Sequence, residues 1–358
     1  MLRITQIIDS LEGGGAERMA VSYANALEGK IGFSGLIATR GEGLLKSEIN
    51  PGVGYLYLRK KNVIDFSALW RLYQYCKVNR INILHAHSSS YFIAVLIGWM
   101  LPKMHVIWHD HYGMSDRLDE RKAGILKSFS KFFSGIISVN YKLQQWALQT
   151  LHCSNVIYLP NFVPSKRDEP VSANLKGRPG KRILCLANLR PQKNHMMLLE
   201  VAARIRTMHP EWTFHIVGKD FNDSYSAQIK NKVETDNLSD NVYFYGSRND
   251  AVALIDQCDV FVLTSISEGL PISLLEAGRA QKAVVVTAVG EIPNIIRNAE
   301  NGMIVPSNDI DAFETALVAV LTNESLRTGI GNGLSETVRE NYLDEVVIDN
   351  YISWIGKL

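Results

Sequence analysis

The sequence predicts an α/β protein made of two doubly wound units, and three observations lead to this prediction. Short apolar runs rich in β-branched residues alternate with stretches of helical spacing along most of the chain. The polar segment 164–181 interrupts this alternation and is rich in Pro, Gly and charged residues. The alternation then restarts. A length of 358 residues also suits two domains. We therefore expect domains at 1–163 and 182–343, joined by a linker at 164–181.

The first half predicts a parallel sheet covered on both faces, because strands that alternate with helices must run parallel. Its expected strands are 2–8, 33–39, 83–87, 105–109, 136–139 and 156–159. Its expected helices are 16–27, 66–78, 92–101, 118–133 and 142–151.

The second half predicts another unit of the same kind. Its expected strands are 182–187, 213–217, 242–245, 260–264, 283–287 and 303–305. Its expected helices are 196–208, 224–235, 251–257, 272–280, 310–321 and 324–341. A last helix, 344–354, has no strand after it.

Composition excludes several classes of protein. An apolar fraction of 46% and a net charge of +2 exclude intrinsic disorder. The most apolar window, 91–101, is too short to span a bilayer, and the N-terminus lacks the pattern of a signal peptide. The four cysteines are far apart and have no metal-binding spacing, which favours buried thiols in a reducing compartment. We expect a cytoplasmic protein.

The two halves differ in charge. Residues 1–163 carry +7 and residues 164–358 carry −5. Between Arg117 and Lys131 the chain has five basic residues with phenylalanines close by, which is typical of a helix that lies on an anionic membrane; packing of these aromatic rings on the sheet is the alternative. Peripheral contact with the inner face of the cell membrane through the first domain is therefore an expectation, and nucleic acid is not an expected partner.

A glycine-rich turn follows the first strand. Gly13, Gly14 and Gly15 precede Glu17 at the start of a helix, where free backbone N–H groups can meet an anion. A dinucleotide fingerprint fails here, because its third glycine would fall on Arg18 and no acidic residue follows the second strand.

Two His-x-His pairs end strands of the first half. His85 with His87, and His109 with His111, each point to one face of a strand. Each pair could ligate a metal, but no third ligand at helical His/Glu spacing is evident. A single histidine in acid–base chemistry or substrate contact is the favoured interpretation, and we expect no metal.

Two loops of the second half carry the strongest candidates. Arg190 and Lys193 precede a helix, where fixed cations suit a diphosphate. Glu268 lies in a loop after a strand, and Glu276 follows eight residues later inside the next helix, where a carboxylate can accept hydrogen bonds from a vicinal diol such as ribose. The alternative without a functional role is a capped helix with two solvated acidic side chains.

A third acidic pattern is better explained by helix capping. Asp309-Ile310-Asp311 precedes an amphipathic helix, so Asp309 or Asp311 is expected to cap that helix rather than to bind a metal–nucleotide complex.

These segments together resemble the retaining glycosyltransferases of family 4, which have the GT-B fold. Glu268-Gly269-Leu270-Pro271 through Glu276 resembles the Glu-x7-Glu signature of that family. The turn at 13–17 is similar to its first glycine-rich loop, and Leu159–Val163 to its Pro-Asn-Gly-Val segment. The segments 244–248 and 300–306 resemble later landmarks in the same order. The resemblance implies two Rossmann-like domains that face a central cleft, with helix 344–358 crossing back onto the first.

The resemblance also implies roles for named residues. In the donor site, Glu276 would bind ribose, Glu268 the donor sugar, the backbone at Gly269 and Leu270 the diphosphate, and Arg190 and Lys193 the leaving group. Gly14 and Gly15 would lie against the transferred sugar and phosphate. His109 would be the active-site histidine. Acceptor contacts are assigned to Glu17, His87 and His111.

Three positions depart from the family pattern. Asn188 stands where the family usually has an arginine, Phe162 replaces a glycine, and Asn294 replaces a glutamate. Arg190 lies two positions after the usual arginine.

The predicted function is a retaining, metal-independent transfer of a sugar from a nucleoside-diphosphate sugar, with a UDP-sugar as the first guess. The acceptor is a saccharide or a lipid-linked saccharide in cell-surface polysaccharide synthesis, and no cofactor is expected. A GT-B sugar-nucleotide epimerase or hydrolase, a His-x-His metallohydrolase and a sugar-nucleotide-binding module without turnover remain alternatives. An NADP dehydrogenase is the least favoured.

Overall fold

The computed structural model describes residues 1–166, 174–248 and 250–358. Within these residues the chain divides into two compact units: unit 1 comprises Met1–Pro164 and Asp344–Leu358, and unit 2 comprises Ser165–Leu343. The first domain was predicted to end at 163 and the returning helix to begin at 344, and both positions lie within one residue of this division. The second domain was predicted to begin at 182, whereas unit 2 begins at Ser165. Residues 167–173 of the predicted linker lie outside the described residues.

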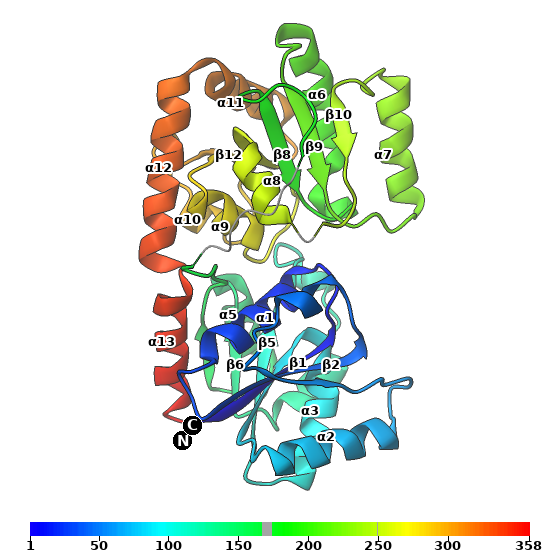
Figure 1. Cartoon of the computed structure of the whole chain (residues 1–358), viewed down its shortest axis with the longest axis vertical. Coiled ribbons are helices and arrows are strands. Elements are labelled where there is room, and N and C mark those ends of the chain that lie inside the picture. Colours follow the sequence, from blue (N-terminus) through cyan, green and yellow to red (C-terminus); the bar gives the residue numbers. More distant parts are fainter. Residues whose placement is uncertain (167–173, 249) are drawn as a thin grey trace. The chain divides into compact units, whose positions relative to one another are not determined.

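Unit 1 is built on a parallel sheet of seven strands in the order β3-β2-β1-β4-β5-β6-β7 (Figure 1). The strands are β1 (Arg3–Ser10), β2 (Phe33–Gly41), β3 (Gly54–Tyr57), β4 (Ile83–His87), β5 (His105–Asp110), β6 (Gly135–Ser138) and β7 (Val156–Tyr158). The edge strand β3 was not predicted. An edge strand is only partly buried, as all four residues of β3 are, so it does not need the apolar run that marks a central strand. Its sequence, Gly-Tyr-Leu-Tyr, lacks such a run.

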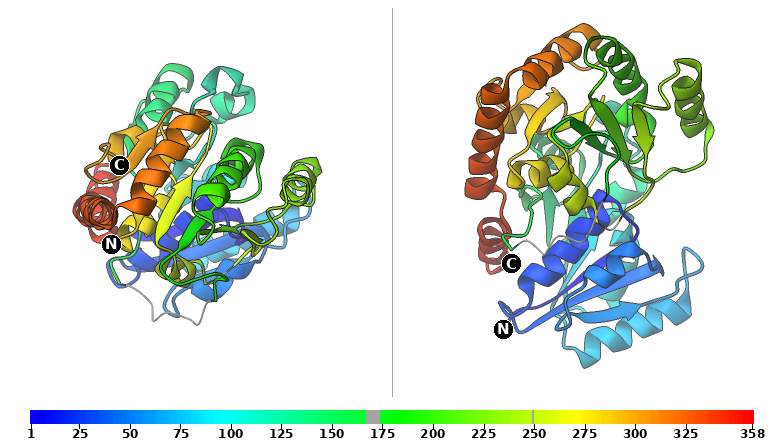
Figure 2. Two further views of the ribbon diagram at one scale, coloured as in Figure 1. Left: turned by 90° about the horizontal axis from the view of Figure 1, so that it is seen from above. Right: turned by 45° about the horizontal axis from the view of Figure 1, so that its top comes forward.

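Helices cover both faces of this sheet. They are α1 (Gly15–Leu27), α2 (Phe66–Val78), α3 (Tyr91–Met100), α4 (Gly124–Ser130), α5 (Tyr141–Thr150) and the C-terminal α13 (Asp344–Ile355). Residues of α2, α3, α4 and α5 share one core on one face, and α1 packs with α13 on the other (Figure 2). The return of α13 to unit 1 is as the resemblance implied.

The long helix predicted over 118–133 is wrong. Residues Leu118–Glu120 form one 3-10 turn, and α4 begins only at Gly124. Arg121 lies between them, and its guanidinium is withdrawn into the unit. It donates to both carboxylate oxygens of Asp110 at 2.7 and 2.8 Å and lies 4.3 Å from the ring of Tyr112 and 4.1 Å from that of Trp146. This buried ion pair holds the chain away from the helical path that its spacing predicted.

Unit 2 repeats the plan with a parallel sheet of six strands in the order β10-β9-β8-β11-β12-β13. The strands are β8 (Arg182–Leu186), β9 (Thr213–Val217), β10 (Val242–Phe244), β11 (Val260–Leu263), β12 (Ala283–Thr287) and β13 (Met303–Val305). The helices are α6 (His195–Met208), α7 (Ser224–Thr235), α8 (Ala251–Gln257), α9 (Ile272–Arg279), α10 (Ile292–Ile295), α11 (Ile310–Thr322) and α12 (Glu324–Asn341).

The packing of unit 2 explains two sequence features. Gly278 of α9 faces Leu334 and Val338 of α12, which leave no room for a β-carbon, so the glycine lets these helices approach closely. Asp309 accepts a hydrogen bond from the backbone N–H of Ala312 at 2.9 Å and caps α11, as predicted.

Two further predictions can be checked in the described residues. Cys76, Cys153, Cys185 and Cys258 are all buried free thiols. Among the described residues, no helix is both long enough and apolar enough to cross a bilayer.

Candidate functional site

The loops that carry the strongest sequence signals lie at one point of the unit 2 sheet. The chain runs from β8 outward through β9 and β10, then returns to place β11 on the other side of β8. The order of strands therefore reverses between β8 and β11. In an open parallel sheet, ligands bind beside the carboxyl ends of the strands at such a reversal. The two loops, 187–194 after β8 and 264–271 after β11, meet there.

An ion pair joins these loops. The ammonium group of Lys193 donates to both carboxylate oxygens of Glu268, at 2.6 and 2.7 Å. The hydroxyl of Ser265 donates to the same carboxylate at 2.7 Å. The side chain of Glu268 is almost fully buried, whereas 22% of the Lys193 side chain is exposed. The partly exposed lysine side chain thus places its cation against a buried carboxylate that fixes its position.

Backbone contacts hold the two loops in register. The hydroxyl of Thr264 donates to the carbonyl oxygens of Lys193 and Asn194, at 3.1 and 3.0 Å. The N–H of Ile266 donates to the carbonyl of Gln192 at 2.8 Å. Because both side chains of the ion pair stand on segments tied in this way, their geometry is set by the sheet rather than by a mobile loop.

A third loop, after β12, packs on the backbone of the Glu268 segment. The N–H of Glu291 donates to the carbonyl of Gly269 at 3.0 Å. Gly290 has a φ of +57°, and a β-carbon there would overlap the carbonyl oxygen of Glu268. The sequence interpretation missed this contact, although a glycine in the loop that follows a neighbour of β11 is the signal that could have revealed it.

The second acid of the signature lies inside the unit. Glu276 stands on α9, which begins at Ile272, and is only 7% exposed. Leu270 is buried as well. A wholly solvated Glu276 is therefore excluded.

Arg190 lies apart from this ion pair. Its guanidinium carbon is 3.5 Å from the centroid of the Phe221 ring, and the residue is exposed. Asn188, which occupies the usual arginine position of the family, accepts a hydrogen bond from the backbone N–H of Lys219 at 2.8 Å. Lys193 is thus the predicted cation that the fold brings to Glu268, and Arg190 is not brought to it.

Unit 1 has a corresponding reversal of strand order, between β1 and β4. Gly14 is the N-cap of α1, and a β-carbon there would overlap the carboxylate of Glu17. The hydroxyl of Ser10 lies 3.5 Å from the same carboxylate. Burial raises the pKa of Glu17, which favours its protonated form relative to a solvated glutamate. Glu17 and the glycine turn therefore form one compact site at the start of α1.

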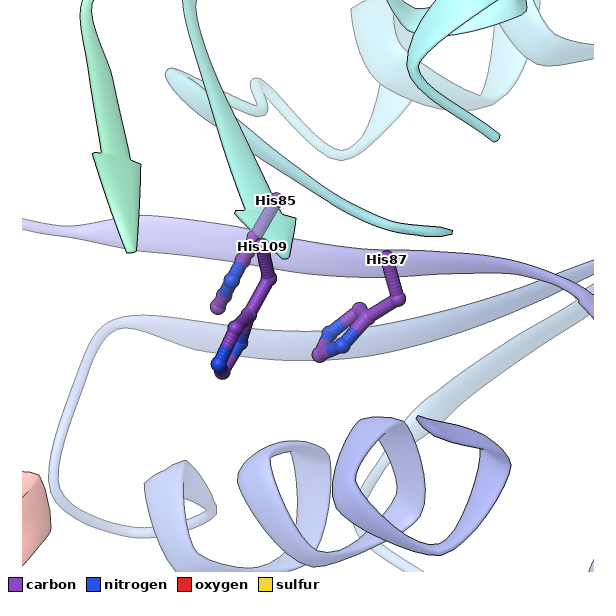
Figure 3. A group of neighbouring side chains, drawn as sticks. All are labelled: His85, His87 and His109. Atoms are coloured by element: carbon purple, nitrogen blue, oxygen red, sulfur yellow. The ribbon is translucent and has the colours of Figure 1, made fainter. Parts of the chain in front are cut away.

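Four histidines gather on the same face of the unit 1 sheet. His85 and His87 of β4 and His109 of β5 are fully buried beneath α1, and their rings lie together (Figure 3). His111 follows β5 and is partly exposed; its ring centroid is 3.9 Å from that of His109. Alternation along the strands explains the cluster, because Leu84, Ala86 and Trp108 point to the opposite core.

Some ring nitrogens of these histidines have hydrogen-bond partners and others have none. Nε2 of His87 lies 2.9 Å from Oε1 of Gln6, and Nδ1 of His87 lies 2.9 Å from Nε2 of His111. Nδ1 of His85 lies 2.9 Å from the hydroxyl of Tyr351 on α13. Among the described residues, Nε2 of His85 and both ring nitrogens of His109 have no partner. A buried polar group without a partner costs about 1–3 kcal/mol.

Burial keeps these rings neutral. It lowers the pKa of His85, His87 and His109 well below the usual value, and it lowers the pKa of His111 to about 3. The neutral rings keep free lone pairs at neutral pH. In the described residues, His85, His87 and His109 are the group whose donor atoms, all within 4.8 Å of one another, could hold a metal ion.

The structure thus brings the predicted residues together in two separate sets. Lys193, Glu268, Gly269, Leu270 and Glu276 belong to the β8–β11 region of unit 2, and Gly14, Gly15, Glu17, His87, His109 and His111 to the β1–β5 region of unit 1. His87 and His109 lie behind His111 and are closed to solvent. The catalytic role of His109 stays a prediction.

Comparison with protein families decides the class of the protein. The family described as "Glycosyltransferase Family 4" matches residues 13–167, and "Glycosyl transferases group 1" matches residues 166–335. The chain is a family-4-like glycosyltransferase. The Glu268 and Glu276 segment lies within the second match.

Relatives of this glycosyltransferase include enzymes named for lipid-linked substrates. It is 26% identical over 317 residues to the UDP-Gal:alpha-D-GlcNAc-diphosphoundecaprenol alpha-1,3-galactosyltransferase of Escherichia coli, with 81% of each chain covered. It is 24% identical over 356 residues to a Campylobacter jejuni enzyme, the GalNAc-alpha-(1->4)-GalNAc-alpha-(1->3)-diNAcBac-PP-undecaprenol alpha-1,4-N-acetyl-D-galactosaminyltransferase, with 95% of this chain and 94% of that one covered.

Solved structures confirm the GT-B fold of the glycosyltransferase. Anabaena HepE in complex with UDP and glucose matches with a TM-score of 0.82 at 13% identity, covering 100% of both chains. Sucrose-phosphate synthase from Thermosynechococcus elongatus matches with a TM-score of 0.80 at 17% identity, covering 100% of this chain and 99% of that one.

Proposed function

We propose that this glycosyltransferase moves a sugar from a UDP-sugar to a lipid-linked saccharide, with retention at the anomeric carbon and without a metal at the donor. The observation that carries the proposal is the Lys193–Glu268 pair at the point where the strand order of unit 2 reverses. A cation held there on rigid loops suits a diphosphate.

The donor site works by exchanging partners of Lys193. In the absence of donor, the Glu268 carboxylate accepts the hydrogen bonds of the Lys193 ammonium group. A bound diphosphate takes its place beside Lys193 and frees Glu268 to accept hydrogen bonds from hydroxyls of the donor sugar. Glu276, buried on α9, accepts hydrogen bonds from the ribose. The backbone at Gly269 and Leu270 meets the phosphates.

The transfer step breaks the bond between the anomeric carbon and the diphosphate oxygen and forms a bond from that carbon to an acceptor oxygen. The acceptor hydroxyl gives its proton to the departing diphosphate, so no protein nucleophile is needed. Lys193 stabilises the charge that grows on the leaving group. Such fixed electrostatic stabilisation is commonly the largest contribution to catalysis. We assign Gly14, Gly15 and His109 to the side of the reacting sugar. We assign Arg190, which is exposed and stacks on the Phe221 ring, to the nucleotide diphosphate.

Two observations support a lipid-linked acceptor. The Escherichia coli and Campylobacter jejuni relatives are named for undecaprenol-diphosphate substrates. Unit 1 also has a pocket of about 880 Å³. It is lined by Asp65 and by Glu42, which pairs with Lys46, and otherwise by basic and apolar side chains that suit a diphosphate attached to a lipid. Those side chains are Lys46, Arg59, Lys61, Arg71, Ile64 and Phe66. Glu17 and His111, both partly buried, are the proposed contacts of the acceptor saccharide, with His87 behind them.

We also propose contact of unit 1 with the inner face of the membrane. Trp99 and Phe132 are 52% and 41% exposed, and their ring centroids are 5.1 Å apart. Ile125 is 68% exposed on α4, and Lys131 lies over the Phe132 ring. Apolar side chains flanked by lysines suit a surface of anionic lipid, even though they do not lie on one long helix.

A transfer assay tests the function. The protein is incubated with labelled UDP-, GDP- and ADP-sugars and with undecaprenyl-diphosphate-linked GlcNAc in vesicles, and the anomeric configuration of the product is read by NMR. We expect α-linked product from one UDP-sugar without added divalent metal. Consumption of donor without acceptor would favour the hydrolase or epimerase alternative, and strict dependence on added Mg²⁺ or Mn²⁺ would contradict the metal-free donor site.

A pair of matched variants distinguishes a loss of the donor site from a general effect of removing a cation from unit 2. Lys193→Ala should abolish transfer. Arg204→Ala removes another cation of unit 2, one whose partners Asp311 and Glu314 lie on the surface, and should leave transfer unchanged. Equal losses in both variants would contradict the assigned donor site.

A further inference from the structure

A group of polar side chains at the carboxyl ends of β1, β2 and β3 has no role in the transfer described above. Asp9 stands near the end of β1, and Thr39 and Arg40 stand near the end of β2. Lys60 follows β3, and its backbone N–H donates to the carbonyl of Thr39 at 2.7 Å. Ser89, in the turn after β4, completes this group, which we call the Asp9 cluster. Its place is the edge at which an open parallel sheet binds ligands.

The carboxylate of the Asp9 cluster already has its partners. The hydroxyl of Thr39 donates to Oδ1 of Asp9 at 2.5 Å, and the hydroxyl of Ser89 donates to Oδ2 at 2.6 Å. Nε of Arg40 lies 3.9 Å from Oδ1, too far for a hydrogen bond. Within the described part of the chain the Arg40 guanidinium donates no hydrogen bond, and 41% of its side chain is exposed. Its N–H groups are therefore open to a ligand.

Lys60 is a buried lysine whose ammonium group has no partner among the described residues. Lysines are almost never buried without one, because an uncompensated ammonium loses its hydration. Burial and, after it, the positive charge of Arg40 lower the pKa of Lys60, whereas Asp9 and Asp65 raise it. Two cations thus lie close enough to oppose each other's charge, and neither donates to the carboxylate between two hydroxyl groups.

The second acid that acts on Lys60 serves a helix instead. The carboxylate of Asp65 accepts hydrogen bonds from the backbone N–H groups of Lys61 and Ala68, at 3.1 and 3.0 Å, and caps α2. Asp65 therefore compensates Lys60 only at a distance. An anion from outside the described chain is the partner that would satisfy both Lys60 and Arg40.

We propose that Lys60 and Arg40 bind one singly charged oxyanion of the acceptor, such as the carboxylate of an acidic sugar or a phosphodiester. The charge balance selects this class, because the two cations and the carboxylate of Asp9 leave one positive charge. The pocket of unit 1 has four basic side chains against two carboxylates among the described residues, which suits a doubly charged diphosphate. The planar guanidinium of Arg40 can donate two parallel N–H bonds to an oxyanion, and Lys60 supplies a third donor.

The Asp9 cluster is adjacent in the chain to the proposed acceptor site. Asp9 directly precedes Ser10, whose hydroxyl lies 3.5 Å from the carboxylate of Glu17, and the glycine turn begins at Gly13. The inference rests on the proposed function in one respect, since that function makes the carrier of the anion a saccharide acceptor. It adds that this acceptor carries a negative charge close to the sugar that receives the transferred group.

Binding of small probes tests the site without any transfer reaction. Methyl α-D-glucuronide, dimethyl phosphate and the neutral methyl α-D-glucoside are titrated into the full-length protein, and binding is followed by ligand-observed NMR. We expect a charged probe to bind and the neutral one not to bind. The affinity should fall about tenfold or more in Lys60→Met and in Arg40→Gln. It should not change in Lys30→Met, which removes a surface lysine that pairs with Asp349.

Each outcome of this titration is decisive. Tighter binding of the glucuronide assigns the anion to an acidic sugar, and tighter binding of dimethyl phosphate assigns it to a phosphodiester. Equal binding in the wild type and in Lys60→Met, or no binding of either charged probe, would overturn the inference. Probe binding that depends on Lys60, in a protein that transfers no sugar, would refute the proposed function and leave the anion site standing.

A stability measurement distinguishes a ligand-binding lysine from a structural one. Lys60→Met keeps the length of the side chain and removes a buried charge that has no partner in the described residues. We therefore expect the ligand-free variant to have a Tm at least as high as that of the wild type. A lower Tm would show that the ammonium group stabilises the fold, which would contradict a charge kept for a ligand.

Discussion

The two units use the same sheet geometry to present opposite chemistry. In both, the strand order reverses beside the first strand, at β1–β4 in unit 1 and at β8–β11 in unit 2. Unit 2 places a charged pair there, with a partly exposed lysine against a buried carboxylate. Unit 1 places neutral rings there, sealed under α1 and α13. The position of a site is thus given by topology, whereas its ligand is chosen by the few side chains that follow the strands.

The largest effect should come from breaking the charged pair of unit 2. Glu268→Gln keeps the shape of the side chain but removes the charge that positions Lys193 and that accepts hydrogen bonds from the donor sugar. We expect the turnover number to fall by about 10²–10³-fold, as for the loss of one fixed electrostatic contact. Steady-state kinetics with the identified donor measures it. A change in KM alone would instead assign Glu268 to ground-state binding.

The buried ion pair of unit 1 should matter for stability. Arg121→Leu leaves the carboxylate of Asp110 buried without its bidentate partner, and loss of one member of a buried pair costs about 3–5 kcal/mol. Urea unfolding measures this free energy. The surface variant Arg204→Ala is the control and should cost less than about 1 kcal/mol, because exposed pairs contribute little. Similar costs for the two variants would show that Asp110 reaches solvent once its partner is gone.

The contact of the β12 loop with the Glu268 segment predicts a smaller loss. Gly290→Ala must accept both a φ of +57° and an overlap with the Glu268 carbonyl, at a cost of about 1–3 kcal/mol. Gly180→Ala has a similar φ, +85°, but no atom within 4 Å of its β-carbon. The difference between the two in chemical denaturation isolates the overlap. Donor affinity should fall only in Gly290→Ala, so equal donor binding in both variants would separate this loop from the site.

A further effect in unit 2 is a pH dependence of stability. Burial lowers the pKa of His215 to about 3, while its ring contacts Thr213 and Tyr245. The unfolded chain binds a proton near pH 6.5 and the folded one does not, so the stabilising contribution is complete above pH 6.5 and is lost as pH falls toward 3. The slope for one such group is up to about 1.4 kcal/mol per pH unit. His215→Phe should flatten the dependence of the urea midpoint between pH 6.5 and pH 4; an unchanged slope would mean that His215 titrates normally.

The sequence was sufficient for the two parallel sheets and for the meeting of two unit 2 loops, for a physical reason. Buried parallel strands must be short apolar runs, and the loops after them carry the polar residues, so Lys193 and Glu268 could be assigned to one edge before their contact was seen. The edge strand β3 was not predicted because its sequence lacks that apolar run. The prediction of one helix over 118–133 was wrong because helical spacing carries no information on the ion pair between Asp110 and Arg121.

The unit 1 cluster shows a second limit of sequence analysis. The His-x-His spacing correctly placed each pair on one face of a strand. It could not show that Tyr23, Phe162 and Tyr351 would cover that face, because those residues come from α1, from a loop and from the C-terminal helix. Whether a histidine meets substrate or is sealed inside depends on such distant segments.

The most direct test of the account is calorimetric titration of UDP, GDP, ADP and CMP into the metal-stripped protein. The account predicts that UDP binds at one site and that this binding is lost in Lys193→Ala and Glu276→Ala, but is retained in Arg204→Ala. Binding of UDP that is unaffected by Lys193→Ala and Glu276→Ala would contradict the assignment of the donor site to the β8–β11 loops of unit 2.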